Sequence, residues 1–161
     1  MSAHEPTHQW TCTIEGPPVA KGRPRVSNRG GYPRIYTPQK TAKWEDAAAV
    51  ILRAAWGSSK GDAPLTGPVS VALLVRLPRP KRLTCSHVRT CSCSDVVKSG
   101  AALVAPTKPD IDNLAKASLD ALVRGQVIED DRQVVGLAVS KHYAAADSEP
   151  GVTITLAWPS L

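Results

Sequence analysis

Four stretches of the chain have the hydrophobic pattern of strands with a buried face, in which apolar residues recur at alternate positions. The first alternates and stops at a Gly-Pro-Pro sequence, and the second is rich in β-branched residues, with Val69, Val71, Leu73 and Val75 on one side. In the third, Val135, Leu137 and Val139 are expected to face inward. The four predicted strands are Trp10–Glu15, Pro68–Leu77, Gln133–Tyr143 and Val152–Trp158.

Two other stretches carry apolar residues at spacings of three and four, which predicts helices with one buried face. The first helix is expected to start with Thr37 as N-cap and Pro38 in the first helical position, and to run to about Trp56. Its predicted buried face consists of Trp44, Ala47, Ala48, Ile51, Leu52 and Ala55. The second helix is predicted over Asp110–Arg124, with Gly125 following its last turn. Its predicted buried face consists of Ile111, Leu114, Ala115, Leu119 and Leu122.

These elements predict an α+β fold in which a mixed, largely antiparallel sheet packs with two principal helices. A chain of 161 residues can bury its own core, so we expect one domain over residues 1–161. Residues 16–37 are rich in Gly, Pro and Arg, which predicts an exposed loop or hairpin. Residues 78–107 show no sustained hydrophobic periodicity, which predicts an insertion. There is no secretory signal and no apolar run long enough to cross a bilayer, so we expect a cytoplasmic protein without a membrane partner.

The charge is divided unevenly along the chain. The formal net charge is +6, but residues 1–98 carry 15 Lys and Arg against 6 Asp and Glu, whereas residues 99–161 carry 5 against 8. Seven basic residues and no acidic one lie in the stretch from Gly16 to Lys43. Clustered positive charge gains affinity for phosphate backbones by releasing counterions, so we expect nucleic-acid binding here. Surface solubility is the alternative explanation of the same charge.

The acidic residues of the second half gather around the second predicted helix. Asp110 and Asp112 open it, Lys116 follows one turn later, and Glu129-Asp130-Asp131 lies beyond its end. Clustered carboxylates bind hard cations such as Mg²⁺, which activates water for phosphodiester hydrolysis, and a nearby lysine can stabilise the negative charge that develops. The alternative explains each residue singly: Asp110 caps the helix, Asp112 complements the helix dipole, and Lys116 makes a surface ion pair. Residues 130 and 131 reach the start of the helix only if the chain returns along it.

A second group of metal-ligand residues lies in the insertion. Cys85, His87, Cys91 and Cys93 are spaced closely enough to hold Zn²⁺, although more tightly than in most zinc sites. The alternative is a reduced loop whose cysteines have no ligand. Tyr32 and Tyr36, among the arginines of the predicted hairpin, either stack on nucleic-acid bases or pack at the edge of the hairpin itself.

The ordered motifs resemble those of the RusA family of Holliday-junction resolvases. The resemblance is carried by Lys108-Pro-Asp-Ile-Asp-Asn-Leu-Ala-Lys116, then Asp120-Ala-Leu122, Gly125, Ile128-Glu-Asp-Asp131 and Gln133-Val134. Lys21-Gly-Arg-Pro-Arg25 and Tyr36-Thr-Pro38 are similar to the opening of that family. The similarity covers most of the chain apart from about the first eight residues and residues 83–100.

The resemblance implies a homodimeric, Mg²⁺-dependent endonuclease that nicks four-way DNA junctions symmetrically in a bacterial or phage-infected cell, with Mn²⁺ as an alternative cofactor. The family's functional carboxylates correspond to Asp110, Asp112 and Asp131 and its functional lysine to Lys116, with Asp130 as a supporting ligand. The expected DNA contacts are Lys21, Arg23, Arg25, Arg29, Arg34, Lys108 and Asn113. Two alternatives remain: a nuclease for other branched DNA, and a junction-binding protein without catalytic activity.

Overall fold

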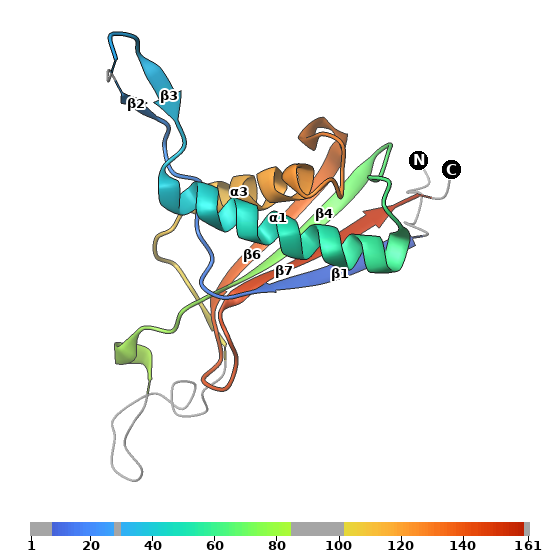
Figure 1. Ribbon diagram of the computed structural model, residues 1–161. Coiled ribbons are helices and arrows are strands. Elements are labelled where there is room, and N and C mark those ends of the chain that lie inside the picture. Colours follow the sequence, from blue (N-terminus) through green and yellow to red (C-terminus); the bar gives the residue numbers. More distant parts are fainter. Residues whose placement is uncertain (1–7, 28–29, 85–101, 160–161) are drawn as a thin grey trace.

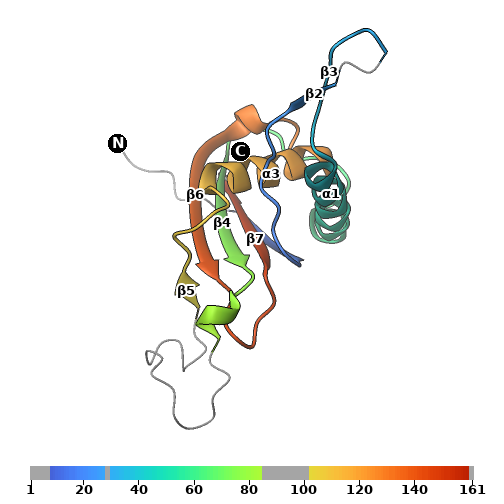
Figure 2. The same ribbon diagram turned by 90° about the vertical axis from the view of Figure 1, so that its left-hand side faces the viewer.

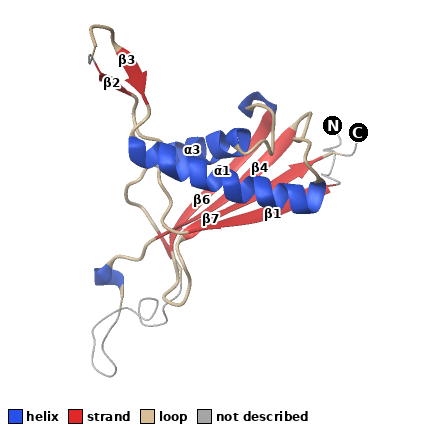
Figure 3. Cartoon of the chain, viewed as in Figure 1, coloured by secondary structure: helices blue, strands red, loops and turns tan. Residues whose placement is uncertain are grey.

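The computed structural model describes residues 8–27, 30–84 and 102–159, and Figures 1 and 3 show how these segments are arranged. These described segments form a five-stranded sheet, a small two-stranded hairpin and two long helices. The strands are β1 (His8–Glu15), β2 (Arg25–Ser27), β3 (Arg34–Tyr36), β4 (Val69–Leu77), β5 (Leu103–Val104), β6 (Val134–Tyr143) and β7 (Gly151–Trp158). The helices are α1 (Gln39–Lys60) and α3 (Ile111–Arg124), with short 3₁₀ turns η1 (Lys81–Leu83) and η2 (Asp131–Gln133).

The main sheet has the order β1-β7-β4-β6-β5 and is mixed. Strand β4 pairs antiparallel with β7 and parallel with β6, while the β1–β7 and β5–β6 pairs are both antiparallel. A parallel pair cannot be joined by a tight turn and needs a crossover, and helix α3 lies within the connection from β4 to β6. This arrangement confirms the predicted α+β class with its mixed, largely antiparallel sheet and two principal helices.

Both helices cover the same face of the sheet, as the turned view in Figure 2 shows. The inward residues of the central strand β4 (Val69, Val71, Leu73, Val75, Leu77) are all buried, as the alternating pattern predicted. The opposite face of the sheet carries threonine pairs across β1 and β7, with Thr11 and Thr13 hydroxyls 3.1 and 3.0 Å from those of Thr155 and Thr153. The hydrophobic core therefore lies in one layer, between the helices and the sheet.

Helix α1 differs from its prediction at both ends. Its N-cap is Pro38, not Thr37, and the helix continues past Trp56 to Lys60. The Ser58 and Ser59 hydroxyls donate to carbonyls four residues earlier, and Ser59 also accepts a hydrogen bond of 3.0 Å from the Trp10 indole of β1. Ser59 thus ties the last turn of α1, beyond the predicted end of the helix, to strand β1.

The buried face of α1 is also rotated from the predicted one. Ala47 is exposed and Ile51 is 41% exposed, whereas Glu45 is fully buried. Alanines fit either face of a helix, so their spacing could not decide which side packs. One carboxylate oxygen of this buried glutamate accepts a hydrogen bond from Lys21, which is distant in sequence.

Helix α3 ends at Arg124, as predicted, and its buried side includes Leu114, Ala121 and Leu122. Gly125 follows it because a Cβ there would lie 2.8 Å from the Ala49 carbonyl oxygen of α1. The glycine is thus required by close helix packing.

The predicted inward residues of β6 are only partly correct. Val139 is partly buried against the core, but Val135 is 71% exposed and Leu137 is 48% exposed. A register shift between Val69 and Ser70 leaves Val135 without a partner on β4. Leu137 is paired with the buried Val71, but β5 pairs with β6 only at His142 and Tyr143, so Leu137 lies on an uncovered part of the outer strand. None of the helices in the described part of the chain is long and apolar enough to span a membrane.

Candidate active site

The start of helix α3 carries the predicted catalytic residues. Asp110 occupies the N-cap position with extended backbone, yet its carboxylate makes no capping hydrogen bond to the helix. Asp110, Asp112 and Lys116 are exposed, and neither Asp112 nor Lys116 takes part in an ion pair within the described residues. The structure therefore does not support the explanation of these residues one by one: the Asp110 side chain makes no capping hydrogen bond, and Lys116 makes no ion pair among the described residues.

Lys141 of β6 holds the segment that leads into Asp110. Its Nζ donates hydrogen bonds to the carbonyl oxygens of Thr107 at 2.6 Å and Pro109 at 2.7 Å. The Thr107 and Tyr143 hydroxyls lie 2.6 Å apart and join the same two segments. Lys141 was not among the residues predicted from the sequence, because a single lysine in a strand carries no signal until its carbonyl partners are known.

A hollow of about 700 Å³ opens beside the start of α3. It brings the carboxylate-bearing Asp110 together with three of the expected DNA contacts, Arg23, Lys108 and Asn113, and is completed by Ala20 and Pro109. A second hollow, of about 540 Å³, shares Ala20, Arg23 and Pro109 with it and extends past Arg25 to Lys40. The two hollows therefore adjoin each other, and together they are lined by the basic residues Arg23, Arg25, Lys40 and Lys108.

The β2–β3 hairpin projects beyond the start of α1 (Figures 1 and 2), and its Arg25 lines the second hollow. Arg25 on the hairpin is exposed, and Arg34 begins β3. Tyr32 is 78% exposed and Tyr36 46% exposed, so these rings do not pack into a core and are available for stacking. Arg29 lies outside the described residues, as do Cys85, His87, Cys91 and Cys93 of the predicted zinc group.

Lys21 was expected to contact DNA, but the structure engages it within the protein. Its Nζ lies 2.7 Å from Glu45 of α1 and 2.5 Å from Asp120 of α3, and Arg124 lies 3.4 Å from the other oxygen of Glu45. Burial lowers the pKa of Lys21, but its hydrogen bonds to Asp120 and Glu45 outweigh burial and leave the pKa raised. Lys21 also donates its backbone N–H to the Asn113 carbonyl at 2.8 Å. Lys21 therefore fixes the basic loop to both α1 and α3.

The second acidic cluster is organised by its own turn. Asp130 caps η2, accepting a 2.9 Å hydrogen bond from the Arg132 backbone, and the Gln133 side chain accepts from the Asp130 backbone in return. Gln133 also donates to the carbonyls of Leu65 and Gly67, both at 3.0 Å. The carboxylate of Asp130, expected as a supporting ligand, is thus used in capping, while that of Asp131 is exposed.

The two acidic clusters lie at opposite ends of α3 (Figure 1). Asp110 precedes its first residue and Asp131 follows its last, and a helix of 14 residues is about 21 Å long. Among residues 8–27, 30–84 and 102–159, no three His, Cys, Asp or Glu side chains are grouped so that they could hold a metal ion. One chain therefore does not gather the three predicted aspartates around a single ion. The chain does return after Gly125, but Asp131 comes before the returning strand starts.

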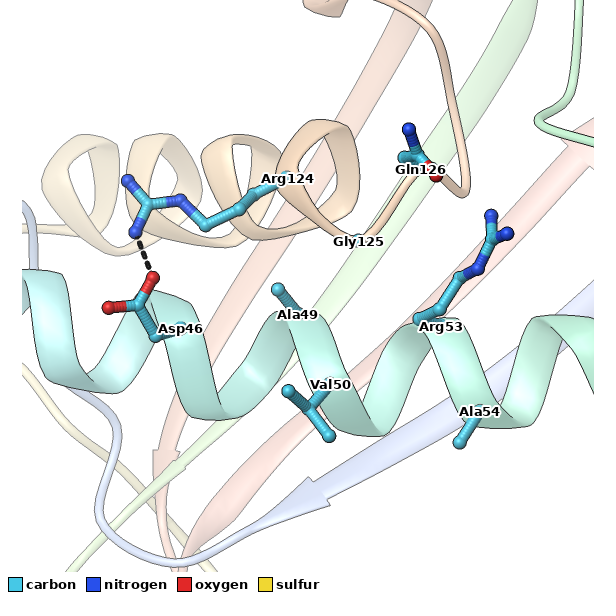
Figure 4. A pocket seen from close by; sticks show the side chains of 8 residues that line it. All are labelled: Asp46, Ala49, Val50, Arg53, Ala54, Arg124, Gly125 and Gln126. Carbon is cyan, nitrogen blue, oxygen red and sulfur yellow. Dashed lines mark hydrogen bonds and ion pairs between the residues drawn. The ribbon is translucent and has the colours of Figure 1, made fainter.

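Another hollow, of about 550 Å³, lies between α1 and the far end of α3 (Figure 4). Asp46 is the one carboxylate that lines it and is paired with Arg124. Ala49, Val50 and Ala54 make much of the wall apolar. Arg53 also lines this hollow, but the carboxylate of the hollow is already paired with an arginine, whereas Asp110 belongs to no ion pair within residues 8–27, 30–84 and 102–159.

Comparison with known proteins places these features in one family. The family described as Endodeoxyribonuclease RusA matches residues 15–157, which include both helices and both acidic clusters. The chain is also 35% identical over 145 residues to an uncharacterized protein, YqaN, of Bacillus subtilis (strain 168), and the match covers 89% of this chain and 92% of that protein.

Proposed function

The chain belongs to the RusA family of endodeoxyribonucleases, and from this premise we propose that it resolves four-way DNA junctions by metal-dependent hydrolysis of phosphodiester bonds. The observation that carries this proposal is the hollow in which Asp110 lies among Arg23, Lys108 and Asn113. Binding a polyanion requires only positive charge, so an exposed carboxylate set among cations indicates chemistry on the bound strand. This argues against a protein that only binds junctions.

The basic residues of the hollow would hold the scissile strand. Arg23 and Lys108 are exposed and suited to neighbouring phosphates, and Asn113 offers an amide close to Asp110. Lys116 lies one turn further along the same helix, without an ion pair among the described residues. Its ammonium would stabilise the charge that develops on the phosphate oxygens and the leaving oxygen.

Mg²⁺ is the cofactor we propose, with Mn²⁺ as the alternative, because carboxylate oxygens suit hard cations. When bound, such an ion supplies an activated water for the hydrolysis. Asp110 and Asp112 are the exposed carboxylates at the helix start, but two side chains with no third ligand among the described residues do not fit a complete ion site.

We also propose that the protein acts as a homodimer on DNA in the cytoplasm of a bacterial or phage-infected cell. A four-way junction is nearly two-fold symmetric, and a two-fold dimer presents two equivalent sites to opposing strands. Paired nicks placed symmetrically would then yield two intact duplexes.

The test is cleavage of a synthetic four-way junction, with flap, fork and linear duplexes of matched sequence as controls, in Mg²⁺ and in EDTA. We expect paired nicks in opposing strands of the junction that require the metal. Faster cleavage of the flap or fork would assign the protein to other branched DNA. Tight junction binding without cleavage in either Mg²⁺ or Mn²⁺ would refute catalysis.

A further inference from the structure

We propose that Lys21 is a positioning residue for cleavage, because it holds the Asp120 carboxylate away from Lys116 and so leaves the Lys116 ammonium free for the DNA. The inference rests on the proposed function and concerns how its catalytic lysine is kept without a partner. Lys116 has an acidic neighbour on its own helix, and the structure gives that neighbour to another lysine.

Lys116 and Asp120 lie four residues apart on α3, a spacing that makes two side chains neighbours on the surface of a helix. Lys116 is nevertheless exposed and belongs to no ion pair within residues 8–27, 30–84 and 102–159. The Asp120 carboxylate instead meets Lys21, whose Nζ lies 2.5 Å from its Oδ2. Lys21 therefore occupies the carboxylate that is within reach of Lys116.

Contacts at both ends fix Lys21 along this side of α3. Its backbone N–H donates to the Asn113 carbonyl oxygen at 2.8 Å, and its Nζ reaches Asp120, about two helical turns further on. The same Nζ donates to Glu45 of α1 at 2.7 Å, and the Glu45 side chain is fully buried. Only 20% of the Lys21 side chain is exposed, so its ammonium has little freedom to leave the two carboxylates.

Asp120 gains more from Lys21 than it would gain from Lys116. The Lys21 ammonium is already fixed beside Asp120 by its bond to Glu45, so forming this pair costs little conformational entropy. Lys116 is exposed and would lose rotamer freedom and hydration in a pair, and exposed pairs of this kind stabilise a protein little. A lysine that precedes its acidic partner along a helix is also in the less favourable order. Asp120 therefore stays with Lys21 as long as Lys21 is present.

The proposed role of Lys116 depends on this arrangement. Its ammonium stabilises the negative charge that develops on the phosphate oxygens, and a carboxylate beside it would oppose that stabilisation. At the spacing of neighbouring helix side chains, and with a dielectric between those of water and of a protein surface, a free Asp120 carboxylate would lower the rate about tenfold. Lys21 thus has one acidic partner that serves stability, Glu45, and one that serves cleavage, Asp120.

Two rescue variants of Lys21→Met separate these roles. Lys21→Met alone should slow single-turnover cleavage of the four-way junction about tenfold while changing junction affinity far less. Adding Asp120→Asn should raise the cleavage rate to that of the Asp120→Asn single variant, without restoring the melting temperature. Adding Glu45→Gln should instead raise the melting temperature and leave cleavage slow.

Lys21→Met with Glu45→Gln also provides a more stable background for the same comparison. If Lys21→Met alone folds poorly, cleavage is measured in this background with and without Asp120→Asn, and the same tenfold difference in rate is expected, at about tenfold. Both variants are assayed below their melting temperatures, so that the rates refer to folded protein.

A matched control removes a carboxylate elsewhere. Asp147→Asn, in the exposed turn between β6 and β7, changes the net charge by the same amount and should not rescue Lys21→Met. Equal cleavage rates with and without Asp120→Asn, in either background, would overturn the inference, and so would rescue by Asp147→Asn. Both outcomes leave the proposed function intact, because the wild type still cleaves. A wild-type protein that fails to cleave four-way junctions would refute the proposed function itself.

Discussion

Replacing Lys21 by Met tests whether this residue fixes the structure or binds DNA. The substitution removes the ammonium that lies 2.7 Å from Glu45 and 2.5 Å from Asp120, and it leaves the fully buried Glu45 carboxylate with only Arg124 nearby, at 3.4 Å. Removing one partner of a buried ion pair costs about 3–5 kcal/mol, because the remaining charge is uncompensated. Arg124 remains and a fifth of the Lys21 side chain is exposed (20%), so we expect a loss of about 3 kcal/mol.

Urea denaturation followed by tryptophan fluorescence measures this loss. We expect a lower midpoint at unchanged slope, and a melting temperature roughly 6–12 °C lower for a chain of this length. Lys43→Met is the matched control, since Lys43 is exposed on α1 and belongs to no ion pair among the described residues, and should change stability by less than about 0.5 kcal/mol. Adding Glu45→Gln to Lys21→Met removes the uncompensated charge and should restore part of the stability.

The pH dependence follows from the raised pKa of Lys21. A lysine whose pKa is higher in the folded state stabilises the protein fully below its unfolded pKa of about 10.4, and this contribution is lost as pH rises through the folded value. The stability difference between wild type and Lys21→Met should therefore be constant from about pH 6 to 9 and shrink only above about pH 10.

Salt dependence of junction binding separates the two roles of the basic loop. Each phosphate contact contributes about 0.9 to the slope of log K against log salt concentration. Lys21→Met should leave that slope unchanged, whereas Arg23→Met with Arg25→Met should make it shallower. A Lys21→Met variant as stable as Lys43→Met, with a shallower slope, would refute the positioning role and return Lys21 to the DNA contacts.

Three further outcomes are expected. Lys116→Ala should slow single-turnover cleavage by about 100-fold or more while changing junction affinity far less, since its proposed partner is the transition state; equal losses in both would make it a simple phosphate contact. Lys141→Met, which removes two hydrogen bonds to the segment before Asp110, should slow cleavage without weakening DNA binding, as measured by rate and by filter binding; a normal rate would contradict its positioning role. Cys91→Ser with Cys93→Ser should keep cleavage, because the proposed chemistry lies outside the insertion. Elemental analysis without chelator separates the two readings of the cysteines: zinc that the wild type holds and this variant lacks indicates a zinc site, and its absence indicates a reduced loop without a ligand. Complete loss of cleavage would make the insertion part of the active site.

The hydrophobic pattern of the sequence predicted an element correctly where the type of each residue matches its burial in the fold. The alternating valines of β4 predicted a strand with one buried face, because only apolar side chains fill that face. The ordered motif from Lys108 to Asp131 likewise identified the family from the sequence alone. Its acidic residues start the right helix, although their carboxylates do not serve that helix as caps.

The tertiary structure decided which residues meet. Glu45 faces the core because Lys21, 24 positions away, neutralises it between two helices, and no helical spacing encodes that contact. Lys141 and Gln133 act on backbone carbonyls of distant segments, and such partners carry no residue-type signal. The two acidic clusters that read as one site in sequence are held apart by the rigid length of α3, because a helix converts 14 residues into a fixed distance.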